Sequence, residues 1–354
     1  MPADRTDTAP GAPTLSDVAA RADVSTATVS RALNVPGQVS EATRARVMQA
    51  VRDLGYAPNF GARALAAKRT NTFGAVIPTM DNAIFARGLQ AFQDRLREDG
   101  VTLLVASSSY KPEQEEEQIR TLITRGAEAL LLIGHDRTEA AYALLDRQRI
   151  PYLVTWAWEA QAPRPGVGFD NRAAMQALAA EVIALGHRHL GLITADPAGN
   201  DRARARIEGV RAAMAAAGRD KDALRIEETP YAIAGGAAAF ARLMAVRPRP
   251  TAVLCGNDVL AAGALTQARA DGIAVPGDVS ITGFDDIELA AILTPALTTV
   301  HVPHREMGRR AAEVLLDMRA GAAAPPGLRL DVGVAWRDSL GPPPRRAFDG
   351  SPGA

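Results

Sequence analysis

One segment near the N-terminus, residues 14–34, constrains the fold of this chain more than any other. Its sequence is TLSDVAARADVSTATVSRALN, in which apolar residues recur at helical spacing behind Thr14, a typical helix N-cap. After a break at residues 22–24, Ser25 caps a second helical pattern that reaches Leu33. Two short helices joined by a tight turn form a helix-turn-helix, a unit that lays its second helix in the major groove of DNA.

A third amphipathic helix is expected at residues 40–54, where apolar side chains recur on one face. Arg44, Arg46 and Arg52 lie elsewhere on this helix and are available for DNA phosphates. An ordinary bundle of Ala-rich helices is the alternative for the first two helices. The third helix favours a compact DNA-binding headpiece instead.

The exposed face of the second helix is expected to be small, polar and basic. Arg31 is the main candidate for base recognition, since its guanidinium fits the acceptor edge of guanine, and Thr26 adds a polar or methyl contact. The candidate DNA-contacting residues of the headpiece are Thr14, Ser25, Thr26, Ala27, Thr28, Ser30, Arg31 and Asn34.

A longer pattern extends this segment and points to a family. DVAxxAxVSxxTVSRxLN at residues 17–34, followed by GYxPNxxARxL at residues 55–65, resembles the lactose-repressor (LacI/GalR) family of bacterial transcription regulators. The resemblance extends from residue 14 to about residue 340. It implies a helix-turn-helix headpiece, a hinge helix that orders on operator DNA, and an effector-binding core. Ala27 departs from the family, in which a longer side chain often occupies this position.

By the same resemblance, residues 59–66 form the hinge helix, which lies in the minor groove. Leu65 would be the apolar residue that two subunits insert between base steps, and Tyr56 would anchor on a phosphate. Core packing is the ordinary role of such a leucine, but the neighbouring basic residues and the lack of acids at residues 60–70 favour insertion. The hinge region adds four candidate DNA-contacting residues, Tyr56, Asn59, Arg63 and Leu65.

The charge of the chain is divided between the headpiece and the rest. Residues 1–70 contain nine Lys/Arg and six Asp/Glu, a net charge of +3. The whole chain contains 40 of each kind, so residues 71–354 contain 31 and 34, a net charge of −3. The small basic excess is confined to the region expected to contact phosphates, and the neutral whole chain argues against loose binding of polyanions.

Length and composition bound the class of protein. A chain of 354 residues suggests two or three domains, and 47% hydrophobic residues suffice for a sizeable core. The single cysteine, Cys255, excludes an intrachain disulfide. No apolar run is long enough to cross a bilayer, and MPADRTDTAPGAP lacks the apolar stretch of a signal peptide. We therefore expect a cytoplasmic protein with no membrane partner.

Beyond residue 70, apolar runs alternate with helical patterns, which predicts parallel sheets with helices on both faces. The expected strands are too many for one sheet, and the resemblance implies two doubly wound subdomains between which the chain crosses three times. The expected strands are 73–77, 102–106, 130–133, 152–155, 190–194, 252–256 and 280–284. The expected crossover helices include 85–98, 113–124, 173–185 and 259–270.

The predicted fold class is an all-α helix-turn-helix headpiece followed by an α/β core of two doubly wound parallel-sheet subdomains, similar to periplasmic binding proteins. The expected parts are a disordered tail at 1–12, the headpiece at 13–57, the hinge helix and linker at 58–70, the core at 71–340 and a disordered tail at 341–354. Within the core, the N-subdomain takes residues 71–168 and 301–325, and the C-subdomain takes residues 169–300 and 326–340.

Ligands of doubly wound sheets bind beyond the carboxyl ends of the strands, which face the cleft in a two-lobed protein. The resemblance implies effector contacts for Arg206 in RIEG, Asn257 in an Asn-Asp motif and Asp285 in a Gly-Phe-Asp motif. Aromatic side chains would add an apolar wall for a sugar ring. The candidate effector-binding residues are Asn82, Phe85, Ser107, His135, Trp156, Asp170, Arg202, Arg206, Tyr231, Asn257 and Asp285.

Several nearby residues have simpler explanations. Asp258 is expected to cap the helix that follows it rather than contact a ligand. His187 and His189 fit a turn at a helix end and not a metal site, because no Cys or carboxylate lies at ligand spacing. For Trp158, packing and ligand contact both stay open. No metal or cofactor is expected.

The segments SYKPEQEEEQI, VGFDN and GHRH resemble the gluconate-repressor branch of the family, which implies a sugar acid as effector. A neutral sugar and then an aromatic acid are the alternatives. Trp156 is a departure, because many sugar-binding relatives carry a polar residue about there. We expect a homodimer on a palindromic operator, since each headpiece contacts one half-site. The Pro- and Gly-rich residues 341–354 exclude a tetramer-forming coiled coil.

Two other classes of protein fit the sequence less well. An enzyme of the common classes would carry a signature such as a Walker loop, G-x-S-x-G, H-E-x-x-H or a dinucleotide-binding G-x-G-x-x-G after a strand, and the chain carries none of these. A transport-type solute-binding protein would share the two-lobed architecture but would begin with a signal peptide in place of a DNA-binding headpiece. A regulator, and not an enzyme, is predicted.

Overall fold

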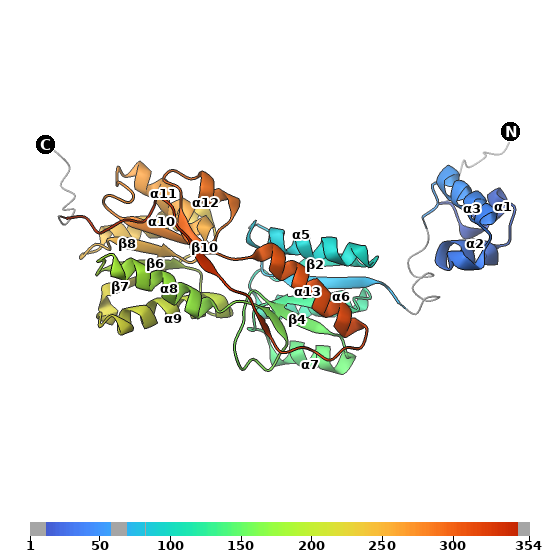
Figure 1. Cartoon of the computed structure of the whole chain (residues 1–354), viewed down its shortest axis with the longest axis horizontal. Coiled ribbons are helices and arrows are strands. Elements are labelled where there is room, and N and C mark those ends of the chain that lie inside the picture. Colours follow the sequence, from blue (N-terminus) through green and yellow to red (C-terminus); the bar gives the residue numbers. More distant parts are fainter. Residues whose placement is uncertain (1–11, 58–68, 82, 346–354) are drawn as a thin grey trace, which may run out of the picture. The chain divides into compact units, whose positions relative to one another are not determined.

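The computed structural model of the chain describes residues 12–57, 69–81 and 83–345. Two compact units make up the chain, with the headpiece in residues 1–71 and the core in residues 72–354 (Figure 1). Within the described ranges, no helix has the length and apolar character needed to cross a membrane.

Three short helices enclose the small apolar core of the headpiece. They are α1 (Leu15–Ala22), α2 (Thr26–Asn34) and α3 (Glu41–Leu54), with a 3-10 turn η1 (Pro36–Gln38) between the last two. Val18, Val29 and Val47 are fully buried, one from each helix. Thr14 and Asp17 form a capping box, in which Thr14 Oγ1 accepts from the Asp17 N–H at 3.3 Å and the Asp17 carboxylate accepts from the Thr14 N–H at 2.8 Å. The predicted helix-turn-helix with a third helix is confirmed.

The first lobe of the core is a six-stranded sheet whose neighbouring strands all run parallel. In spatial order its strands are β11 (Leu328–Arg329), β5 (Gly166–Gly168), β4 (Tyr152–Thr155), β3 (Ala129–Ile133), β1 (Thr72–Ile77) and β2 (Thr102–Ser107). Its helices are α5 (Ala83–Glu98), α6 (Pro112–Thr124), α7 (Glu139–Gln148) and α13 (His304–Arg319). Successive strand residues face opposite sides, so Phe73 and Ala75 share a core with α5 and α13, whereas Val76 packs with α6 and α7.

The second lobe repeats this plan. In spatial order its strands are β12 (Gly333–Ala335), β10 (Thr298–His301), β9 (Ser280–Asp285), β8 (Ala252–Cys255), β6 (Leu190–Thr194) and β7 (Leu224–Glu228), of which only β12 is antiparallel to its neighbour. Its helices are α8 (Asn171–Ala184), α9 (Asp201–Ala216), α10 (Ile233–Ala245), α11 (Asp258–Ala270) and α12 (Glu288–Ile292), with a 3-10 turn η2 (Lys221–Ala223). Helices α10 and α11 cover one face of the sheet, and α8 and α9 cover the other (Figure 1).

The seven predicted strands and the four predicted crossover helices are all present, with ends within two residues of those expected, and the fold class is confirmed. The chain crosses between the lobes after β5, after β10 and after β11. The expected third crossing at residue 326 is wrong. Leu328–Arg329 pairs in parallel with Val167–Gly168 of the first lobe, so the chain crosses only between Arg329 and Gly333.

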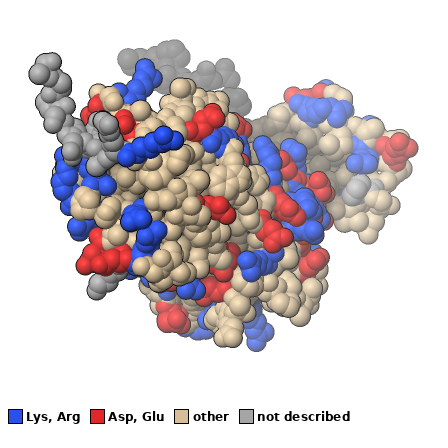
Figure 2. Space-filling view, turned by 60° about the vertical axis from the view of Figure 1, so that its left-hand side comes forward, with Lys and Arg blue, Asp and Glu red and all other residues tan. Residues whose placement is uncertain are grey.

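Charges of both signs are mixed on the core. On the face that Figure 2 shows, acidic and basic side chains are interspersed rather than gathered by sign. Such a surface does not attract a polyanion over a wide area. This agrees with the division of charge in the sequence, which leaves the basic excess to residues 1–70.

Candidate functional site

The outer side of α2 presents a small polar face. Thr26, Ala27 and Arg31 are exposed, whereas Val29 and Ala32 on the inner side are buried. Within the described part of the chain, no hydrogen bond or ion pair engages Arg31. Its guanidinium is therefore available to an acceptor outside the protein.

Arg206 of α9 lies buried where the two lobes of the core meet. Its Nε donates to Asn171 Oδ1 at 2.9 Å, and its Nη1 donates to the carbonyl oxygen of Gly256. The guanidinium lies over the ring of Phe284, with Cζ 3.7 Å from the ring centroid. These contacts fix the guanidinium and leave its Nη2 3.8 Å from the carboxylate of Asp285.

Asp285 is the least satisfied acidic group of the cleft. It ends β9 with φ at 104°, a conformation that side-chain-bearing residues rarely adopt. Neither carboxylate oxygen has a hydrogen-bond partner among the described residues, although the residue is only 1% exposed. His304 Nε2 is 4.0 Å from one oxygen, and burial lowers the pKa of this imidazole. A buried carboxylate without hydrogen bonds is costly, so Asp285 is a candidate to accept hydrogen bonds from ligand hydroxyl groups.

An aromatic wall stands on the first-lobe side of the cleft. Trp156, just beyond β4, is 1% exposed and makes an edge-to-face contact with Phe85, at 5.3 Å between ring centroids. Its ring centroid is 6.0 Å from that of His304. The indole N–H has no partner within the described residues, and the Trp156 carbonyl accepts from Asn171 Nδ2 of the second lobe at 2.9 Å. The wall thus combines an apolar surface with an unused donor.

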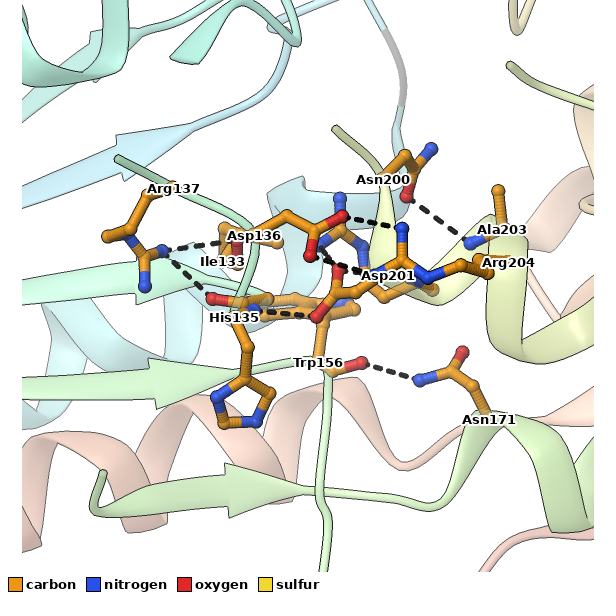
Figure 3. A network of polar contacts seen from close by, with 12 residues as sticks. Ile133, His135, Asp136, Arg137, Trp156, Asn171, Asn200, Asp201, Ala203 and Arg204 are labelled. Atoms are coloured by element: carbon orange, nitrogen blue, oxygen red, sulfur yellow. Dashed lines mark hydrogen bonds and ion pairs between the residues drawn. The ribbon is translucent and has the colours of Figure 1, made fainter. Parts of the chain in front are cut away.

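The loop after β3 joins the lobes directly (Figure 3). The N–H of His135 donates to Asp201 Oδ2 at 2.6 Å. The Asp136 carboxylate accepts two hydrogen bonds from the Arg204 guanidinium, at 2.8 and 2.9 Å. His135 and Asp136 belong to the first lobe, whereas Asp201 and Arg204 lie in the first turn of α9. The N-terminal turn of α9 is therefore docked on the first lobe.

A cavity of about 680 Å³ opens beside this contact and is lined by both lobes. Tyr110 of the first lobe and Tyr231 of the second contact each other in its wall, at 5.8 Å between ring centroids. Burial and the nearby Tyr231 raise the pKa of the Tyr110 hydroxyl, which stays protonated. Asn200, which is 2% exposed, also lines the cavity, and its Nδ2 has no partner within the described ranges. The volume is sufficient for a small ligand.

Comparison with known proteins identifies the family. Residues 14–59 match the model of bacterial regulatory proteins of the lacI family, and residues 179–340 match that of the periplasmic binding protein-like domain. The chain is 35% identical over 312 residues to the HTH-type transcriptional regulator GntR of Pseudomonas aeruginosa, covering 88% of this chain and 90% of that relative. The chain belongs to the lacI family. The resemblance seen in the sequence is confirmed, and so is the prediction of a DNA-binding regulator rather than an enzyme.

Solved lacI-family structures share the whole architecture. A lacI-family transcriptional regulator from Silicibacter pomeroyi is 30% identical, with a TM-score of 0.84 over 93% of this chain and 99% of that chain. The lac repressor dimer bound to operator and the anti-inducer ONPF is 25% identical, with a TM-score of 0.80 over 93% of this chain and 99% of that chain. Headpiece and two-lobed core therefore occur together in both.

The DNA-contacting residues expected of a lacI-family headpiece differ in their surroundings. Asn34 Nδ2 donates to Ser30 Oγ at 3.3 Å, and the hydroxyls of Ser25 and Thr28 lie 2.9 Å apart at the start of α2. Tyr56 is half-buried against the headpiece core. Thr14 caps α1. Asn59, Arg63 and Leu65 lie outside the described residues.

The predicted effector-binding residues fall into two groups. Phe85, Trp156, Arg206 and Asp285 are brought together where the lobes meet, Arg202 and His135 lie against Asp201 beside them, and Tyr231 lines the cavity. The others have structural partners: Asp170 caps α8, Asn257 caps α11, and Ser107 Oγ donates to the Pro78 carbonyl. Asn82 lies outside the described residues.

Two simpler explanations from the sequence are also tested. Asp258 is not the N-cap of α11, because the Asn257 side chain accepts the Leu260 N–H, while Asp258 accepts from Ile287 N and Thr299 Oγ1. Burial, with Asp285 nearby, raises the pKa of Asp258 to about 8. His187 bonds Thr251 and the Gly341 carbonyl, and within the described residues no group of His, Cys, Asp and Glu could hold a metal ion.

The sequence did not reveal Asn171 and Tyr110 as members of the site. Asn171 is the first residue of α8 and bridges Arg206 to the Trp156 carbonyl, so it links the lobes. Its position one residue beyond Asp170, directly after a strand, is the signal that could have found it. Tyr110 follows β2 in the same way.

Proposed function

We propose that this lacI-family regulator binds a palindromic operator as a homodimer and represses it, and that a small polyhydroxy compound in the cleft releases it. The observation that carries the effector proposal is the unpartnered, buried carboxylate of Asp285 beside Arg206 at the junction of the lobes. Two hydroxyl groups of a sugar could donate to its two oxygens, and the Trp156 ring could cover an apolar face of the ring.

The charges of the site favour a neutral sugar over the sugar acid that the sequence resemblance implies. Arg206 faces Asp285, and Arg202 Nη1 donates to Asp201 Oδ1 at 2.8 Å, so each arginine has a carboxylate of its own. Three acidic residues line the cavity of about 680 Å³, and none of its described lining residues is Lys or Arg. These acidic residues are Asp81, Asp196 and Glu228. An anion would meet uncompensated negative charge there.

A ligand screen on the full chain tests this proposal. D-glucose and D-gluconate are a matched pair, since they differ chiefly in a carboxylate, and a panel of neutral monosaccharides and disaccharides extends it. A ligand at a hundred times its dissociation constant stabilises the folded state by roughly 2.7 kcal/mol, which a thermal-shift assay detects. Each hit is then titrated against the operator complex in a gel-shift assay. No hit from any polyhydroxy compound would refute the effector proposal, and a hit only from acids would restore the sugar acid.

The homodimer is proposed because each headpiece contacts one half-site, and because the lac repressor structure similar to this chain is a dimer on its operator. Sedimentation of the full chain with and without operator DNA measures the number of subunits directly. A monomer on a single half-site would contradict it.

Arg31→Ala is expected to remove discrimination at one G·C pair of each half-site, at a cost of about 1–3 kcal/mol for the preferred operator. The reason is that Arg31 is the exposed, unengaged guanidinium of α2, and two parallel hydrogen bonds to guanine would be lost. Selection of sites from randomised DNA, with the parent chain and the variant in parallel, shows which position relaxes.

Arg46→Ala is the matched control, because Arg46 is an exposed arginine of α3 and is expected to contact only phosphates. It should weaken all sites alike and reduce the salt dependence of binding. If Arg31→Ala also weakened all sites alike, base recognition by Arg31 would be excluded.

A further inference from the structure

An ion pair outside the proposed effector site joins the two lobes at the edge of the cleft. Arg204 Nη1 and Nη2 donate to Asp136 Oδ2 and Oδ1 at 2.9 and 2.8 Å (Figure 3). Arg204 Nη1 also donates to the Pro197 carbonyl at 3.1 Å, which ties the guanidinium to the second lobe. We propose that Asp136 and Arg204 form a clasp that holds the lobes closed and thereby positions the effector-binding residues.

The first-lobe side of the clasp is shaped for close approach. Gly134, which follows β3, has φ at 70°, a conformation that favours glycine. A Cβ at this position would lie 1.9 Å from Arg202 Nη1 and 2.4 Å from Asp201 Oδ1. Only a residue without a side chain lets the loop lie this close to the first turn of α9.

The same loop is held from behind within its own lobe. The side chain of Arg137 is completely buried and donates to Glu115 Oε1 at 3.1 and 3.2 Å, to Tyr142 Oη at 2.6 Å and to the Gly134 carbonyl at 2.8 Å. A loop fixed in this way presents Asp136 in one place. The loop is therefore an anchor in the first lobe and not a surface segment that happens to meet Arg204.

The second-lobe side of the clasp is the helix that carries the effector-binding arginine. Arg204 and Arg206 are two residues apart in α9, and Asp201 in the same turn accepts the N–H of His135 at 2.6 Å. Burial opposes ionisation of Asp201, but Arg202 and the His135 N–H together hold the pKa of this carboxyl below its usual value. If the first turn of α9 left the loop, Arg206 and the Trp156 wall would move apart with their lobes.

The expected size of the effect follows from exposure. The side chain of Asp136 is 26% exposed and that of Arg204 is 46% exposed, so water and salt screen the pair. Bidentate geometry places it at the upper end for such pairs, and removing it should lower the ratio of closed to open molecules about three- to fivefold. At roughly 1 M salt, where the Debye length is about 3 Å, the difference should shrink.

A distance measurement tests the clasp on the full chain without any effector or DNA. Gln148→Cys at the end of α7 and Ala216→Cys at the end of α9 place spin labels on exposed sites of the two lobes, and the native Cys255 is buried and not labelled. In this background Asp136→Asn, Arg204→Gln and the double variant are compared by electron-spin distance distributions. We expect a longer, broader distance in each single variant, no further change in the double variant, and a smaller difference at high salt.

The matched control is Arg242→Gln, which removes the ion pair between Arg242 and Glu227 inside the second lobe at similar exposure, 51% and 27%. It should leave the inter-lobe distance unchanged. An unchanged distance in Asp136→Asn and Arg204→Gln, or effects that simply add in the double variant, would overturn the clasp. Because no ligand is needed, this result is independent of the proposed effector; the clasp rests on the proposed site only for its consequence, about three- to fivefold weaker binding of whichever screened sugar binds the parent chain.

Discussion

Arg206→Met is expected to abolish the response of operator binding to effector while leaving operator binding itself intact. Arg206 donates to Asn171 and to the Gly256 carbonyl and faces Asp285, so methionine would leave a buried carboxylate without its cation. Loss of one member of a buried, hydrogen-bonded charge pair costs about 2–5 kcal/mol, which corresponds to a loss of effector affinity on the order of 100-fold. A gel-shift titration with the best ligand of the screen measures it: the complex of the variant should persist at concentrations that release the parent chain.

Arg211→Met is the matched control, since Arg211 lies in the same helix but is exposed. Its release curve should match that of the parent chain. Operator affinity in the absence of ligand reports whether each variant is folded. A folded Arg206→Met protein that still released DNA at the parental ligand concentration would remove Arg206 from the effector site.

The sequence predicted those elements whose signals are local. Each predicted strand is a run of four or more apolar residues, and each predicted helix has apolar spacing or a cap. By contrast, β11 is only Leu328–Arg329, both exposed, and nothing in its composition shows that it pairs with β5 across more than 150 intervening residues. The misplaced third crossing has this cause.

The site was predictable to the extent that position after a strand determines it. Arg206 and Asp285 stand in motifs, and Trp156 follows β4, so all three were found. Pairs that form only between the lobes, such as Asp136 with Arg204 or Asn171 with the Trp156 carbonyl, depend on how two sheets are placed relative to each other. For the same reason, the partners already held by Arg202 and Arg206 were not visible, and an anionic effector looked better from the sequence than from the cavity.

Gly308→Val is expected to destabilise the core by roughly 3 kcal/mol or more. Gly308 lies in α13 where this helix contacts α5, and a Cβ there would lie 1.9 Å from the carbonyl oxygen of Gly88. This oxygen belongs to the backbone of a helix and cannot rotate away. Glycine in a helix interior is itself unfavourable by about 1 kcal/mol relative to alanine, so the sign of the effect separates the two contributions.

Urea unfolding followed by tryptophan fluorescence measures this stability in the full chain, because all three tryptophans, Trp156, Trp158 and Trp336, lie in the core. Gly333→Val is the control: Gly333 has nothing within 4 Å of its Cβ position, and the change should stay within about 0.5 kcal/mol. An unchanged or raised midpoint for Gly308→Val would mean that α5 and α13 can separate without cost. Because α13 begins at His304, beside Asp285 and Trp156, such freedom would also mean that this helix does not fix the effector-binding residues.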